Sequence, residues 1–358
     1  MYFSCRETVH SEEVVPSTAF DADAAMLQGA ELIKLRHDPN MLWSTYRRSV
    51  EIYTARKMTN PNDVIDAFSG IMRTLCNARC VEGLLVPVFD IALLWQPRER
   101  LRRRGGFSSW SWAGWIGQVH WFDDRFLENF EQQGRPQTET IKLWVEAHSW
   151  IVWYSSSGTN CQSRAFRMDG PPRLSGSQAH NSGKLLEKHF PGQHIKSLPT
   201  PSLLPDRLEN LENYRHQIRY LQFWTLSVHF NIELDALAVI HHSSLEPENT
   251  GNGLRRFHLI DQYRRECGWV LLNEDWIEKT TSKEDKLQEF ILISETGGSE
   301  QISDLREEEL GQCWNEYNAM MIVWEHGIAE RVGLGRVMKH SLVDSTGLNL
   351  EWKEILLG

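Results

Sequence analysis

The sequence predicts an α+β fold, in which a helical N-terminal region is followed by a mostly antiparallel β sandwich or barrel-like region. Apolar residues recur at helical spacing between residues 42 and 75. The chain after residue 221 instead consists of strand-like runs joined mostly by short connections. Several strands with short connections favour antiparallel pairing, because parallel strands need long crossovers.

These patterns divide the chain into three parts. Residues 1–97 form the helical region, 98–106 a basic linker, and 107–358 a β-rich domain with a long Pro/Ser/Gly-rich loop at 170–206. The 358 residues suit one large domain or two ordinary ones, and the 41% hydrophobic content is enough for a core. Whether the first and last parts share that core is open at this point.

Two helices are expected after residue 41, and a further short one at 20–35. The first has apolar residues at helical spacing: Leu42, Tyr46, Val50 and Tyr53. Asn60 is suited to cap the second, with Pro61 at its first position. The apolar face of that second helix follows at i, i+1, i+4, i+7, i+8 and i+11: Val64, Ile65, Phe68, Ile71, Met72 and Leu75.

Alternating or continuous apolar runs predict the strands. Residues 1–5 resemble the tail of a strand that begins upstream, and residues 6–18 a loop. His326 and Gly327 mark a hairpin turn. The other expected strands are at 142–153, 221–235, 256–261, 267–273, 288–295, 319–325, 328–338 and 350–357.

The most unusual stretch is residues 107–117, with three tryptophans in six positions: Trp110, Trp112 and Trp115. In a strand, Trp110 and Trp112 share one face, so the stretch predicts an aromatic β-hairpin. One interpretation is a tryptophan-rich structural core. The other is a platform for a ligand or protein partner, formed by Trp110, Trp112, Trp115 and Asp123. Asp123 is either an acid beside an aromatic cleft or part of an exposed turn that pairs with Arg125.

The sequence nominates no catalytic residues, cofactor or metal site. It lacks a G-x-S-x-G elbow, a P-loop and an H-E-x-x-H motif, and its six cysteines include no C-x-x-C pair. Five arginines between residues 98 and 104 suit a solvated linker better than an anion site. The net charge of −10 argues against general nucleic-acid binding. No membrane span is expected, a cytoplasmic location fits the cysteine usage, and no oligomeric state is indicated.

Several stretches resemble fungal heterokaryon-incompatibility (HET) domain proteins. The most specific is Leu93-Leu94-Trp95 followed by Phe107 to Trp115, which is similar to the family's Pro-Ser-Trp-Ser-Trp-Ala-Gly-Trp signature, with Ser108 in place of proline. In Ile322 to Arg336, Val323-Trp324-Glu325 departs from the family's Glu-Trp order. The other similar stretches are Met58 to Ile71, Leu221 to Phe230, Cys267-Gly268, Asn273 to Trp276, Glu289 to Ser294 and Glu351 to Gly358.

This resemblance implies that the chain corresponds to the C-terminal part of such a protein, because the family's defining core lies upstream of these stretches. The family is implicated in fungal non-self recognition and in the cell death that follows hyphal fusion. Its core has been compared with TIR-type signalling domains, some of which cleave NAD. Any such catalytic residues would lie upstream, so the resemblance assigns none to this chain.

Three functional hypotheses follow. The first is a non-catalytic recognition or regulatory part of an incompatibility protein, with a protein partner. The second is a hydrolase, acting either on a nucleotide such as NAD together with upstream sequence or through the Trp110/Asp123 region. The third is a truncated gene product without independent function.

Overall fold

The computed structural model describes residues 2–4, 9–11, 42–58, 60–75, 80–121, 144–145, 148–157, 166–167, 219–234, 253–276, 287–296, 316–343 and 350–358. The helix expected at 20–35, the loop at 170–206 and Asp123 lie outside these residues. None of the helices in the described ranges is long and apolar enough to cross a membrane.

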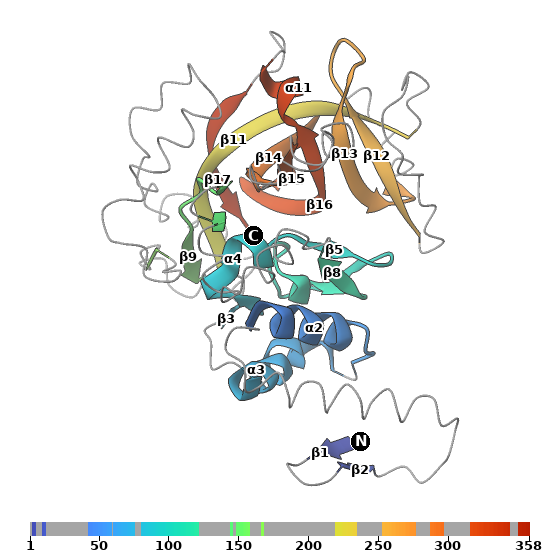
Figure 1. Ribbon diagram of the computed structural model, residues 1–358, viewed down its shortest axis with the longest axis vertical. Helices are drawn as coiled ribbons and strands as arrows, with labels where there is room; N and C mark the ends of the chain where they lie inside the picture. The colour runs from blue at the N-terminus through green and yellow to red at the C-terminus, as the bar shows by residue number, and fades with distance from the viewer. Residues whose placement is uncertain are drawn as a thin grey trace, which may run out of the picture.

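Six antiparallel strands hydrogen-bond into a closed ring, which forms the upper body in Figure 1. The last strand of the series pairs back with the first, as Ser227 opposite Ile291 and Phe230 opposite Gln288 show. The predicted antiparallel, strand-rich character is therefore confirmed. In pairing order the ring strands are β11 (Arg219–Glu233), β12 (Leu254–Ile260), β13 (Glu266–Asn273), β16 (Ile328–Met338), β15 (Glu316–Glu325) and β14 (Gln288–Glu295).

A seventh strand, β17 (Glu351–Leu357), links two strands of the ring directly. It runs antiparallel to β11 from Leu221 to Ser227, and it contacts β16 where Leu357 lies opposite Ala329. Further along β11, β9 (Tyr154–Ser157) pairs with residues 219–222 and also with β10 (Phe166–Arg167). The 15-residue β11 thus organises most of the sheet.

The ring encloses apolar side chains that the pairing register places on one face. Each buried side chain of this size contributes about 1.5–3 kcal/mol. Gly335 lets β16 approach β13 closely, since a Cβ there would lie 2.7 Å from the Val270 Cα. The enclosed residues, all completely buried, are Val228, Phe230, Phe257, Val270, Phe290, Ala319, Met321 and Val337.

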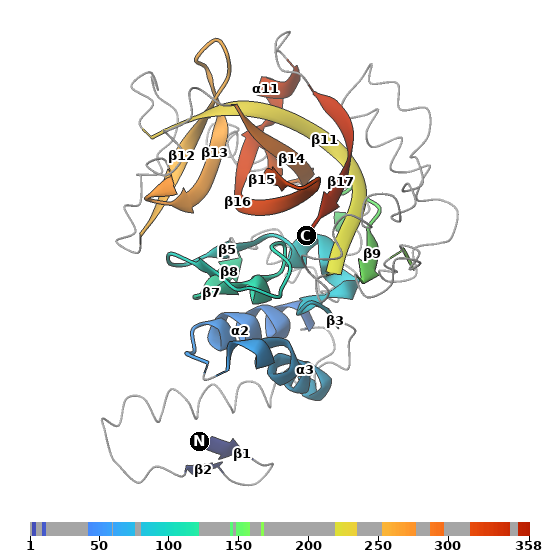
Figure 2. The same ribbon diagram turned by 180° about the vertical axis from the view of Figure 1, so that it is seen from behind.

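Two helices form a separate layer below the ring, as both views show (Figures 1 and 2). They are α2 (Leu42–Thr54) and α3 (Val64–Leu75), and the latter follows a 3₁₀ turn at Pro61–Asp63. Both predicted helices are therefore present. The Asn60 side chain accepts a hydrogen bond from the Asn62 N–H at 3.2 Å, so the predicted cap is also present.

Short elements between residues 80 and 121 fill the layer between these helices and the ring (Figure 2). One buried apolar cluster includes Trp43 of α2, Trp112 of this layer and Phe290 of the ring. The helical part and the ring therefore share a core. The paired strands of the layer are β3 (Cys80–Val81) with β4 (Leu84–Leu85), β5 (Trp95–Pro97) with β8 (Val119–Trp121), and β6 (Arg102–Arg103) with β7 (Trp115–Ile116). Its helical turns are Val86–Val88, α4 (Phe89–Ala92) and Trp112–Gly114.

Outside residues 98–117, two predictions about local structure were wrong. Trp144, Val145 and His148 are helical, although the run from 142 to 153 was expected to be a strand. Contacts between residues four positions apart show the helical geometry. The rings of Trp144 and His148 lie 5.5 Å apart, and the Ser149 N–H donates to the Val145 carbonyl at 3.0 Å. In the expected loop at 6–18, β2 (Val9–Ser11) pairs with β1 (Tyr2–Ser4).

Candidate functional site

The tryptophan segment, residues 107–117, is not the predicted local hairpin. Its Ser111 caps a 3₁₀ turn by accepting a hydrogen bond from the Ala113 N–H at 2.9 Å. The strands on either side of Gly117, β7 and β8, pair with β6 and β5 rather than with each other. Because the turn interrupts the extended backbone, Trp110 and Trp112 do not share a face.

Trp110 and Trp112 are buried on two sides of this layer, at 0% and 1% exposure. The Trp110 ring contacts Phe89 of α4 at 6.0 Å, and its indole N–H donates to the Arg219 carbonyl at 3.3 Å. The Trp112 ring contacts Phe68 of α3 at 4.9 Å. Both rings therefore belong to the core and are not available as a surface platform.

Trp115 is partly buried, and two arginines of the predicted linker fold against this segment. The Trp115 indole N–H donates to the Ser109 carbonyl at 2.8 Å. Arg103 donates to the carbonyls of Gly114 and Phe107, each at 2.8 Å, and lies 5.5 Å from the Trp115 ring. Arg104 is buried and donates to the Trp115 carbonyl at 3.2 Å. Burial lowers the pKa of Arg104, opposed by the nearby Tyr53. The linker prediction expected solvated arginines, but Arg104 is buried and Arg103 is partly buried.

Ser109 connects this segment to the ring and to the last residue of the sequence. Its N–H donates to the Gly358 oxygen at 2.8 Å, and its hydroxyl donates to the same oxygen. That hydroxyl also accepts a hydrogen bond from the Arg331 N–H at 2.8 Å. One serine thus joins the tryptophan segment to β16 and to the end of β17.

The Arg331 side chain completes this connection from inside the core. Its guanidinium is 3% exposed, donates to the carbonyls of Leu93 and Trp95, and lies 3.7 Å from the centroid of the Trp95 ring. Burial lowers the pKa of Arg331 to about 9. We call Ser109, Arg331, Trp95 and Gly358 the junction.

Ser108 extends these contacts to β11. Its hydroxyl donates to the Arg219 carbonyl at 2.7 Å. On the helical side, the Ser111 hydroxyl donates to the carbonyl of Glu82 in the β3–β4 turn. Burial raises the pKa of Glu82 to about 7, opposed by Arg219 and by a backbone hydrogen bond from Ser108.

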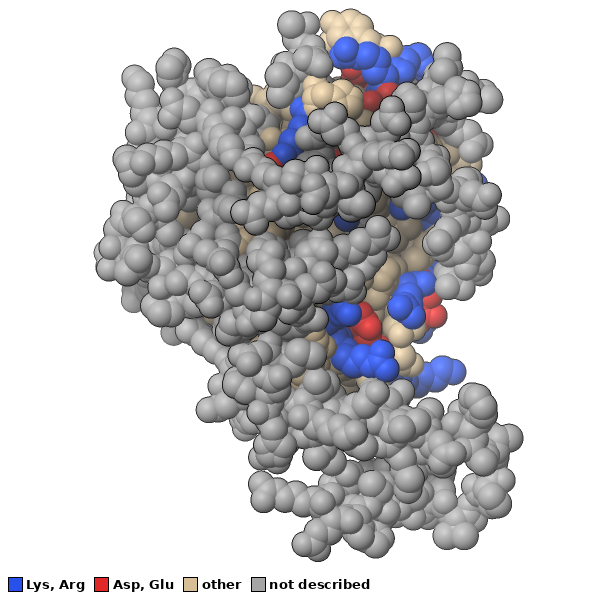
Figure 3. Space-filling view, in the orientation of Figure 1, with Lys and Arg blue, Asp and Glu red and all other residues tan. Residues whose placement is uncertain are grey.

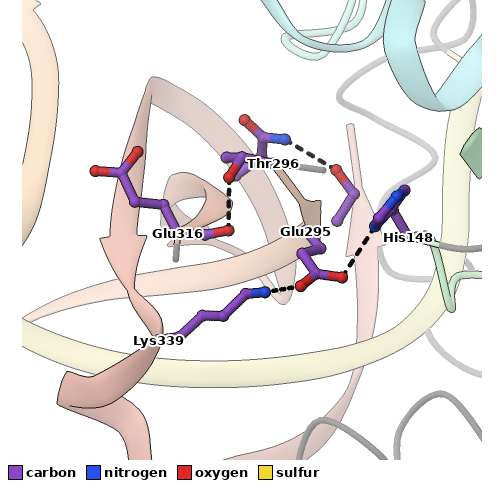
Figure 4. A network of polar contacts seen from close by, with 7 residues as sticks. His148, Glu295, Thr296, Glu316 and Lys339 are labelled. Carbon is purple, nitrogen blue, oxygen red and sulfur yellow. Dashed lines mark hydrogen bonds and ion pairs between the residues drawn. The ribbon is translucent and has the colours of Figure 1, made fainter. Parts of the chain in front are cut away.

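A second polar cluster lies where β14 ends (Figure 4). Glu295 bonds to His148 at 2.9 Å and forms an ion pair with Lys339 of α11 (Lys339–Val343). Thr296 donates its N–H and its hydroxyl to the Glu316 carbonyl, at 3.0 and 2.9 Å. The bond between Glu295 and His148 joins the segment around His148 to the sheet. The cluster therefore has a structural role.

The exposed candidate lies at the β15–β16 hairpin and was not predicted from the sequence. Trp324 is 36% exposed, and its indole N–H donates to Glu289 at 2.7 Å. Lys353 lies 4.6 Å from the Trp324 ring and bonds to Glu289 at 2.8 Å. Leu287, which directly precedes β14, is 50% exposed. We call Leu287, Glu289, Trp324 and Lys353 the Trp324 surface.

Hydrogen bonds hold Glu289 in its charged form. Burial alone would raise its pKa, but hydrogen bonds from Lys353, Ser227 and Trp324 outweigh burial and lower the pKa below its ordinary value. The partners therefore fix the Trp324 ring in one orientation. The sequence feature that could have indicated this surface is Trp324 itself, which lies two positions before the His326–Gly327 turn.

Several other described charges form ion pairs with opposite charges. On the face in Figure 3, several of the visible basic side chains lie beside acidic ones. Arg100 pairs with Asp275 at 2.5 Å, and Arg255 with Glu274 at 3.1 Å. Within the described ranges, no three His, Cys, Asp or Glu side chains are placed to hold a metal ion.

Comparison with family models, curated proteins and solved structures gave no match. Of the predicted contact residues, Trp110 and Trp112 lie in the core, Trp115 lies beside them, and Asp123 is outside the described residues.

Proposed function

We propose that this chain is a non-catalytic recognition or regulatory part of a fungal heterokaryon-incompatibility protein, acting in the cytoplasm through a protein partner. One observation supports the proposal most directly. Four stretches that resemble the family meet at the junction: Leu93–Trp95, Phe107–Trp115, Ile322–Arg336 and Glu351–Gly358. On this interpretation the resembling residues build a scaffold, in which a helical layer supports a barrel-like ring.

The Trp324 surface is our candidate for the partner contact. Tryptophan is enriched among residues that dominate binding energy at interfaces. Here Glu289 and Lys353 already restrict the Trp324 ring, so binding would cost less side-chain entropy. Leu287 adds exposed apolar area directly before β14.

A fungal expression experiment tests this proposal. We expect the chain to alter cell survival after hyphal fusion, and Trp324→Ala to remove that effect. Trp269→Ala is the matched control, because Trp269 is another partly exposed tryptophan of the ring, held by Arg256 at 4.1 Å. Loss of the effect in the control alone would contradict the assignment of the Trp324 surface.

Incubating the purified chain with NAD addresses the competing hypothesis of a nucleotide hydrolase. We expect chromatography to show unchanged NAD after prolonged incubation. Cleavage products that scale with the concentration of the chain would contradict a non-catalytic role.

A further inference from the structure

We propose that Glu82 is a proton-operated latch, which holds the tryptophan segment against the start of β11 while its carboxyl is protonated and loosens that contact when it is charged. This inference goes beyond the proposed function and does not depend on it. It rests on the position of Glu82, on what surrounds its two oxygens, and on the bonds that leave the same turn.

The backbone of the turn fixes where the Glu82 side chain points. Glu82 and Gly83 have positive φ angles of 50° and 81°, as a two-residue hairpin loop requires. The Gly83 carbonyl accepts hydrogen bonds from Tyr46 at 3.0 Å and Trp112 at 3.3 Å, and the Glu82 carbonyl accepts one from Ser111. A Cβ on Gly83 would lie 2.6 Å from the Trp112 ring. These contacts hold the backbone of the turn, and with it the Cα of Glu82, in place.

The surroundings of the carboxyl favour its neutral form. The side chain is 12% exposed, and its Oε2 atom is buried without a hydrogen-bond partner. Among the described residues, the charged group that faces it is Arg219 of β11, whose Nε lies 4.0 Å from Oε1, while the other described elements packed on the turn present hydroxyl, indole and amide groups. A buried carboxylate with one distant counter-charge is costly.

Ser108 connects the Glu82 carboxyl to β11 through hydrogen bonds. Its N–H bonds to the Glu82 carboxyl, and its hydroxyl donates to the Arg219 carbonyl at 2.7 Å. The Trp110 indole N–H donates to that same carbonyl at 3.3 Å. The Ser108 N–H and Arg219 both favour the charged carboxyl, so the loosening comes from the cost of keeping that charge buried. Local opening at residues 108–112 and 219–222 relieves this cost by hydrating the carboxylate, and we therefore expect it when Glu82 is charged.

Hydrogen exchange of the full chain between pH 4 and 8.5 tests the latch, with Glu82→Gln as a permanent mimic of the protonated side chain. The pKa of Glu82 is raised from its ordinary 4.5 to about 7 in the closed state, so the contribution of the protonated side chain is complete below pH 4.5 and is lost as the pH rises through 7. At pH 8.5 we expect residues 108–112 and 219–222 of the wild type to exchange at least about tenfold faster than in Glu82→Gln, and at pH 4 equally fast. Glu351→Gln, at an exposed site, should behave as the wild type.

Arg219→Gln supplies a second test, which keeps the carbonyl used by Ser108 and Trp110. Arg219 lowers the pKa of Glu82, so removing its charge should move the opening to higher pH. Equal exchange in the wild type and Glu82→Gln at every pH would overturn the proposal. An unchanged midpoint in Arg219→Gln would also overturn it, even if Glu82→Gln did not fold.

Discussion

The backbone N–H of Arg331 donates a hydrogen bond to the hydroxyl of Ser109 at 2.8 Å, although the two residues lie 222 positions apart. The same hydroxyl donates to Gly358, so it is used as both donor and acceptor. This relationship places the tryptophan segment inside the molecule as a structural element. The predictions below separate that role from ligand binding.

Replacing Ser109 by alanine should destabilise the protein by about 1–3 kcal/mol, because a buried N–H and a buried oxygen each lose a partner. Urea denaturation measures the change. Ser69→Ala is the control, since Ser69 lies in α3 and alanine favours helix, so little change is expected there. Equal effects of the two substitutions would contradict the role of Ser109.

Replacing Arg331 by lysine should cost about 2 kcal/mol or more, despite the retained charge. The planar guanidinium donates to both the Leu93 and the Trp95 carbonyl and stacks on the Trp95 ring. A lysine ammonium cannot make all three contacts at once. The free energy of unfolding is the measurement. Arg336→Lys, at a partly exposed ion pair with Glu316, should change it by less than about 1 kcal/mol.

Alanine substitution should distinguish the buried from the exposed tryptophans. Trp112→Ala should cost about 3–5 kcal/mol, because it leaves a large cavity beside Phe68. Trp324→Ala should cost much less, since its ring is partly in solvent. Thermal unfolding would compare them, and similar losses for both variants would contradict the assignment of Trp324 to a surface.

The depressed pKa of Glu289 predicts an acid-dependent contribution to stability. Its pKa is lower in the folded than in the unfolded chain, so this contribution is complete above the unfolded pKa and is lost as pH falls through the folded pKa. Trp324→Phe removes one of the three hydrogen bonds and should reduce the stability difference between pH 7 and pH 3. An unchanged difference in chemical denaturation would show that the indole N–H has no part in it.

Local signals in the sequence were enough to predict the main strands and the two helices. The sequence of β16 has the apolar pattern of a strand, and α3 is preceded by its own cap. His326 and Gly327 favour the turn between β15 and β16 whatever the position of the rest of the chain. One of the two interpretations of the tryptophan segment, a structural core, agrees with the burial of Trp110 and Trp112, whereas the hairpin that their spacing predicted is absent.

The parts that sequence could not predict depend on distant partners. Ser111 looked like one residue of an alternating strand, but it caps a turn and bonds to Glu82, 29 positions away. Arg103 and Arg104 looked like a solvated linker because the carbonyls they bind become neighbours only after β6 pairs with β7. The Trp324 surface similarly needs β14, β15 and β17 to meet.

The most direct measurement of the central claim is hydrogen exchange at the Arg331 backbone N–H, compared between Ser109→Ala and the wild type. If the tryptophan segment and β16 form one structural unit, loss of the Ser109 hydroxyl should make this amide exchange faster. Unchanged exchange of the Arg331 amide would contradict a junction built from these two residues.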